Sequence, residues 1–148
     1  MKRLLTVPLI AVMALTLLLG CADAGPKRFV YAYFDCFAAL LEHPKSLVRN
    51  RVLNVLAAIA QWDTENRFDA ILPDFLSHIT DDKPITARQC VKALAQVGLA
   101  KPQYIPRILQ RLHSADLSKY RDSMRPLIDK DIAETENLLR CSFPMTDV

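Results

Sequence analysis

The chain has 148 residues, of which 51% are hydrophobic and 7% aromatic, and it contains three glycines. That length suits one domain with a buried core, and the scarcity of glycine together with many Ala, Leu, Ile, Arg and Lys residues favours an all-α fold over a β fold. The formal net charge is +3; without Lys2 and Arg3, 17 of the 19 basic residues stand against 16 acidic ones, a balance that disfavours binding to nucleic acid.

The first residues have the order of a lipoprotein signal peptide. Lys2 and Arg3 are followed by an uncharged run over 4–19, and a lipobox ends at Cys21. Residues 1–21 are therefore interpreted as a signal whose cleavage leaves a lipid-anchored Cys21 and a membrane-anchored protein. The alternative is a cytoplasmic protein in which residues 9–19 are the last helix of a preceding repeat, an interpretation that Pro8 and the bulk of Leu19 favour.

Two amphipathic helices are predicted next, over 29–42 and 47–60. Apolar residues lie at positions 30, 33, 34, 37, 38 and 41 of the first and at 48, 52, 55, 56 and 59 of the second, which is the spacing of one helical face. The turn between them ends at Ser46, which is placed to cap the second helix. The short turn predicts an antiparallel helix pair.

The same pattern then recurs. A helix over 68–79, in which Pro73 is expected to cause a kink, is followed by a turn and by a helix over 85–98. An offset of 38 residues places Val52 on Cys90 and Leu56 on Leu94. Helix pairs that repeat at this interval fall in the range of HEAT and armadillo repeats.

A third pair is predicted over 103–113 and 123–140, and it matches the first two less well. A second offset of 38 aligns Ile128 with Cys90 and Ile132 with Leu94, after which the match fades, as expected of a capping repeat. The chain is thus predicted to be an α-solenoid of about three helix pairs over 29–140, with a tail at 141–148.

Several segments resemble a known group of repeat proteins. SLVRNRVLNVLAAIA resembles the second helix of a HEAT repeat, and QWDTENRFD, HITDDKPITARQCVKAL and LSKYRDSMRPLIDKDI resemble small bacterial HEAT-like proteins, some of them catalogued as SufBD proteins. The resemblance covers about residues 29–135. It implies a HEAT-like α-solenoid that presents one helix of each pair to a protein, a peptide or, in a branch related to DNA glycosylases, DNA. It does not imply iron–sulfur assembly, because such scaffold proteins are built on β-helical domains.

A non-catalytic scaffold that binds a protein or peptide is therefore the expected function. Trp62 is either an exposed anchor for that partner or a side chain packed between neighbouring repeats, and the second role is the simpler one. A nucleic-acid-binding module of the DNA-glycosylase type is the alternative, but ion pairs with Asp81, Asp82 and Asp116 would neutralise its basic residues. The candidate contact residues are Arg51, Asn54, Trp62, Arg88, Lys92, Gln96 and Arg125.

Neither an enzyme nor a metal site is expected. The sequence has no GxSxG, no glycine-rich phosphate loop, no HExxH and no cysteine with a triad-like partner, so no cofactor is predicted either. Cys21, Cys36, Cys90 and Cys141 form no CxxC pair, and Cys36 and Cys90 are expected to be buried apolar residues. His43, His78 and His113 each fall near the end of a first helix, where a histidine interacts favourably with the helix dipole.

Overall fold

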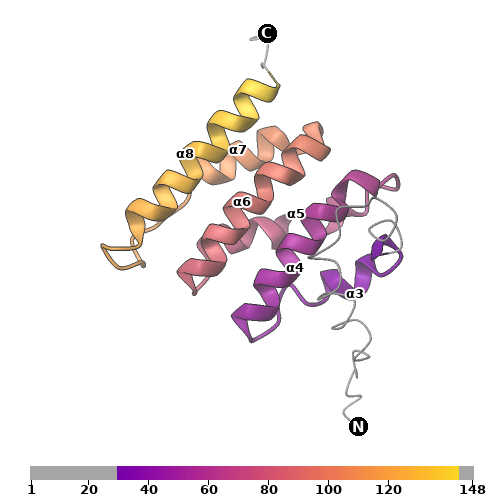
Figure 1. Ribbon diagram of the computed structural model, residues 1–148, viewed down its shortest axis with the longest axis horizontal. Helices are drawn as coiled ribbons and strands as arrows, with labels where there is room; N and C mark the ends of the chain where they lie inside the picture. The colour runs from indigo at the N-terminus through magenta and orange to yellow at the C-terminus, as the bar shows by residue number, and fades with distance from the viewer. Residues whose placement is uncertain (1–29, 144–148) are drawn as a thin grey trace.

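The computed structural model describes residues 30–143 of the chain (Figure 1). Within this range there are six α-helices, three short 3-10 helices and no strand, which confirms the all-α prediction. The α-helices are α3 (Phe34–Ala38), α4 (Ser46–Ile59), α5 (Phe68–Ser77), α6 (Pro84–Ala100), α7 (Ile105–His113) and α8 (Arg125–Ser142). The 3-10 helices are η1 (Ala60–Trp62), η2 (His78–Thr80) and η3 (Pro102–Tyr104).

Three of the helices form one layer. α4, α6 and α8 lie side by side in this order, with α5 and α7 behind them (Figure 1). Near the start of α6, Arg88 is hydrogen-bonded to Asp131 of α8. Near its end, Gly98 contacts Leu139, so α6 and α8 run in the same direction.

Gly98 permits the close packing of these two helices. A Cβ atom at this position would lie 2.5 Å from Cδ2 of Leu139, which is nearer than two carbon atoms can approach. Leu139 is itself fully buried. The absence of a side chain at Gly98 therefore lets Leu139 fill the space against the end of α6.

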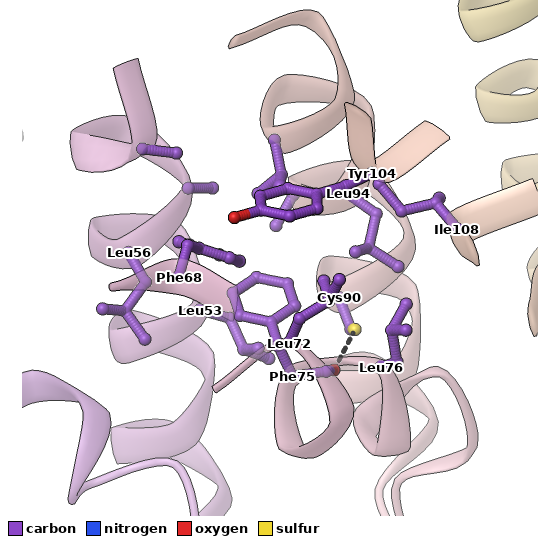
Figure 2. Close-up of a cluster of buried hydrophobic side chains, with 14 of the residues drawn as sticks. Leu53, Leu56, Phe68, Leu72, Phe75, Leu76, Cys90, Leu94, Tyr104 and Ile108 are labelled. Atoms are coloured by element: carbon purple, nitrogen blue, oxygen red, sulfur yellow. Dashed lines mark hydrogen bonds between the residues drawn. The ribbon is translucent and has the colours of Figure 1, made fainter. Parts of the chain in front are cut away.

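The core is continuous from α3 to α8, and Phe68 lies at its centre (Figure 2). The Phe68 ring lies 5.4 Å from the Phe75 ring and 6.0 Å from the Tyr104 ring, measured between centroids. Leucines of α4, α5 and α6 surround it, and Cys90 donates its thiol hydrogen to the Phe75 carbonyl oxygen at 3.3 Å. Burial of these side chains is the main favourable contribution to folding.

The predicted first helix, 29–42, is wrong in its length, because α3 covers only Phe34–Ala38. After α3 the backbone continues in tighter turns, in which the N–H groups of Leu40, Leu41 and His43 each bond to the carbonyl three residues earlier. Tyr33, which was assigned to the buried face, is 60% exposed. A spacing of three and four apolar positions does not distinguish these turns from a regular helix.

Smaller differences occur at other helix ends. Lys45, and not Ser46, is the residue before α4, and its side chain makes no capping hydrogen bond, so the predicted Ser46 cap is wrong. Pro84 begins α6, a position that suits proline because the missing N–H would have had no helical partner there. α8 begins at Arg125 and ends at Ser142, two residues later at each end than predicted.

Candidate functional site

The exposed residues of α4 and α6 form two matching stripes. On α4, Leu47 and Arg51 are exposed, and Asn54 is half-buried with its amide donating to the Asn50 carbonyl at 2.9 Å. On α6 the exposed residues are Ile85, Lys92, Gln96 and Leu99. Spacings of three, four and seven place each set on one side of its helix. Because α4 and α6 are neighbours in one layer, the two stripes together form an exposed face, here called the α4–α6 face.

Two cations of α6 are tied to a carboxylate of α8. Arg88 donates to both oxygens of Asp131, with Nη2 3.3 Å from Oδ1, and Nζ of Lys92 lies 3.5 Å from the same Oδ1. Asp131 is buried, and although burial alone would raise its pKa, the Arg88 and Lys92 charges lower that pKa from its ordinary value. Arg88 therefore serves helix packing, whereas Lys92 keeps an exposed side chain.

The other two candidates also have neighbours within the chain. Arg125 pairs with Asp122, three residues earlier. Trp62 lies in η1, is half-buried and packs against the hydrophobic core. Of the seven candidates, Arg51, Lys92 and Gln96 thus have the most accessible side chains on the layer of α4 and α6.

A buried carboxylate at Asp63 organises the start of α5. Its oxygens accept the backbone N–H groups of Arg67, at 2.8 Å, and Phe68, at 3.0 Å. The Tyr31 hydroxyl donates to Asp63 at 2.7 Å, and Nζ of Lys101 lies 3.8 Å from it. Burial, and then the Asp63 carboxylate, raise the pKa of Tyr31 to about 12. One side chain therefore joins η1, α5 and the turn after α6.

A second buried carboxylate, Asp81, follows η2. Arg49 of α4 binds it through two nitrogens, at 2.8 Å and 2.7 Å, and the Lys83 N–H donates to it at 2.9 Å. Nδ1 of His78 lies 2.9 Å from Oδ2 of Asp81. Burial opposes ionisation of Asp81, but the hydrogen bonds from Arg49, Lys83 and His78 outweigh it and lower the Asp81 pKa from its ordinary value.

A polar pocket of about 360 Å³ lies beside Asp81, between the turn before α4 and η2. Glu42, Asp81 and Asp82 contribute carboxylates to its wall, and Arg49 contributes a guanidinium group. The sequence prediction missed this pocket. The remaining lining residues are His43, Pro44, Ser77, His78 and Thr80.

His78 and His113 lie at the ends of α5 and α7, as predicted. The prediction is wrong for His43, which lies in the turn between α3 and α4 because α3 already ends at Ala38. His113 is the exposed last residue of α7, and Nδ1 of His43 accepts the Lys45 N–H at 3.1 Å. His78 is buried beside Asp81, which helix-dipole reasoning alone does not predict. Over residues 30–143, no group of three or more His, Cys, Asp or Glu side chains is arranged to hold a metal ion.

The cysteines confirm the prediction at one position and contradict it at another. Cys90 is buried, and this burial raises its thiol pKa well above the ordinary value. Cys36 is exposed, so its predicted burial is wrong; it lies within α3 but away from the side on which Phe34 and Phe37 are buried. Cys141 is also exposed, and Cys21 lies outside the described residues.

The signal or helix predicted at 1–21 likewise lies outside the described residues. Among the helices of residues 30–143, none has the length and apolar character needed to span a lipid bilayer. No family model, curated protein or solved structure was found to match the chain. The resemblance to small bacterial HEAT-like proteins accordingly stays a prediction from the sequence.

Proposed function

We propose that this protein is a non-catalytic HEAT-like α-solenoid that binds a protein or peptide through the α4–α6 face. The observation that carries the proposal is the pair of exposed stripes, which combine polar side chains with large apolar ones. Leu47 is 65% exposed and Ile85 is 63% exposed, and they occupy the second position of α4 and of α6. Apolar side chains exposed among polar ones are typical of interaction surfaces.

The charges give less support to a nucleic-acid partner. Phosphate binding depends on clustered cations that are free to replace counterions. Arg88 and Lys92 lie beside Asp131, and Arg125 pairs with Asp122. These carboxylates offset the positive charge on α6 and α8 that a phosphate backbone would need.

The proposed face is tested by substituting four of its residues, Arg51, Asn54, Lys92 and Gln96, with alanine in one variant. A partner is first identified by photo-crosslinking from a benzoylphenylalanine placed at position 96. The variant is expected to keep its helical circular dichroism and to bind that partner at least about tenfold more weakly, because interface centres carry most of the binding energy.

The matched control carries alanine at three exposed positions of the other layer. These are Asp74 of α5 and Arg107 and Gln110 of α7. This variant is expected to bind as the unaltered protein does. Equal affinity of the four-residue variant and the unaltered protein, or equal weakening by both variants, would contradict the assignment of the α4–α6 face.

We further propose that Cys21 is lipidated and tethers the repeats to a membrane. The mass of the N-terminal peptide tests this, with the full chain expressed in a bacterial host alongside a Cys21→Ser variant. A lipid-modified peptide that begins at Cys21 and disappears in the variant is the expected result. An unmodified peptide that begins at Met1, from protein in the soluble fraction, would favour the cytoplasmic alternative.

A further inference from the structure

The polar pocket beside Asp81 contains a buried nitrogen atom without a partner. His78 is 5% exposed, and its Nε2 atom has no hydrogen-bond partner within the described residues. A buried polar atom left unpaired is unfavourable, and most such atoms in folded proteins have a partner. The His78 ring lines the pocket, and its Nε2 atom lies 3.8 Å from the Glu42 carboxylate on the same wall.

The neighbouring carboxylate determines what His78 offers to the pocket. Asp81 accepts two hydrogen bonds from Arg49, and its lowered pKa keeps it ionised at neutral pH. An ionised carboxylate only accepts hydrogen bonds, so Nδ1 of His78 must be the donor in their contact. In a neutral imidazole Nε2 is then an acceptor, and no donor among the described residues reaches it.

The other groups at the pocket are also mostly acceptors. Glu42 is exposed, with 76% of its side chain accessible, and Asp82 also lines the pocket. At one edge Asp82 pairs with Nζ of Lys119, at 3.5 Å, and Lys119 also donates to the Thr80 carbonyl. The chain therefore already binds one ammonium group at this rim, and Glu42 and His78 Nε2 are acceptors without such a partner.

The guanidinium group of Arg49 does not make the pocket an anion site. Its Nε and Nη2 atoms bind Asp81, and its Nη1 atom donates to the carbonyl oxygens of His43, at 2.8 Å, and Pro44, at 3.2 Å. Each of its nitrogens is thus engaged. Asp81 is paired with Arg49 and Asp82 with Lys119, so among the three lining carboxylates Glu42 has no arginine or lysine partner within the described residues. The lining lacks a free cationic donor that would attract phosphate or carboxylate.

We propose that this pocket binds the ammonium or guanidinium end of a lysine or arginine side chain presented by a protein or peptide. Its N–H groups donate to His78 Nε2 and to the Glu42 carboxylate, while the positive charge offsets the charge of Glu42. A metal ion fits less well, because the described residues contain no group of three metal ligands. The inference concerns a site separate from the α4–α6 face and does not depend on that face.

Nuclear magnetic resonance of the His78 ring in the full chain tests the proposal. Capped pentapeptides Gly-Gly-X-Gly-Gly, with X as lysine, arginine or norleucine, are added at constant ionic strength and at about pH 8, where an ordinary histidine is neutral. Before addition, Nε2 is expected to show the ¹⁵N shift of an unprotonated nitrogen. The lysine or arginine peptide is expected to change this shift saturably, and norleucine, which lacks the charge, is not.

Charge variants complete the test. Glu42→Gln is expected to weaken binding of the lysine peptide by about threefold, the size of an exposed ion pair. Glu65→Gln removes the same charge from an exposed residue outside the pocket and is expected to leave binding unchanged. The proposal is overturned by an absent or non-saturable shift, by an equal response to norleucine, or by a free protein in which Nε2 already carries a proton that it donates to Glu42.

Discussion

Replacing Asp81 with asparagine is expected to lower the free energy of unfolding by about 3 kcal/mol, near the lower end of the cost of breaking a buried ion pair. The substitution preserves size but removes the charge that Arg49 pairs with, and the side chains of Arg49 and Asp81 are only 12% and 3% exposed. The new amide group would also face the N–H donors of Arg49, His78 and Lys83. Urea denaturation followed by circular dichroism measures the change.

Asp82 provides the matched control. It is the next residue, but its side chain is 92% exposed, and within residues 30–143 it pairs only with the partly exposed Lys119. Asp82→Asn is therefore expected to cost less than about 1 kcal/mol. If Asp81→Asn cost no more than Asp82→Asn, the buried pair between Asp81 and Arg49 would not contribute to stability in solution.

The contribution of Asp81 should depend on pH in a definite direction. Its pKa is lower in the folded chain than in the unfolded one, because Arg49, Lys83 and His78 favour its ionised form. The stability that ionised Asp81 contributes is fully present above its pKa in the unfolded chain, about 3.9. It is lost as the pH falls through its pKa in the folded chain. The difference in stability between the unaltered protein and Asp81→Asn is therefore expected to narrow below about pH 4.

The helices α4 to α8 could be predicted from the sequence because each buries one side against the same core. In α4 and α6 the buried residues recur at threes and fours, and this pattern located both helices to within two residues at each end. The ends of α3 could not be predicted in this way. Its apolar residues Phe34, Phe37 and Leu41 suit helical and tighter turns equally, and hydrogen bonds local to residues 37–43 decide between them.

Two of the three carboxylates that were expected to form ion pairs do so. Asp81 and Asp82 were expected to pair with basic residues, and they do so with Arg49 and Lys119. Asp116 was expected to do the same; among the described residues it accepts the Ser118 N–H. Arg88 pairs with Asp131, 43 residues later, across the contact between α6 and α8.

The polar pocket could not be predicted from the spacing of residues along the sequence. His43 and His78 were each predicted to lie near helix ends, but nothing in their spacing shows that the turn at 43–44 lies beside η2. Arg49 makes this connection, since it bonds to the His43 carbonyl on one side and to Asp81 on the other. A carboxylate three residues after a histidine at a helix end, as in His78 and Asp81, is the one local signal that could have suggested the pair.

Replacing Asp63 with alanine is expected to destabilise the protein by about 3 kcal/mol, the combined cost of a lost helix cap and of buried donors left unpaired. The variant would leave the N–H groups of Arg67 and Phe68 without their acceptor at the start of α5. It would also remove the acceptor of the Tyr31 hydroxyl. Denaturant unfolding monitored by circular dichroism gives the size of the change.

Two further variants divide this cost into its parts. Tyr31→Phe removes one hydrogen bond but leaves both backbone N–H groups bound to Asp63, so a loss of about 1 kcal/mol is expected. Glu65→Ala, at an exposed position of the same loop, should change stability by less than about 0.5 kcal/mol. If Asp63→Ala and Tyr31→Phe were equally destabilising, the Asp63 carboxylate would contribute through the phenol alone, and the start of α5 would not depend on it.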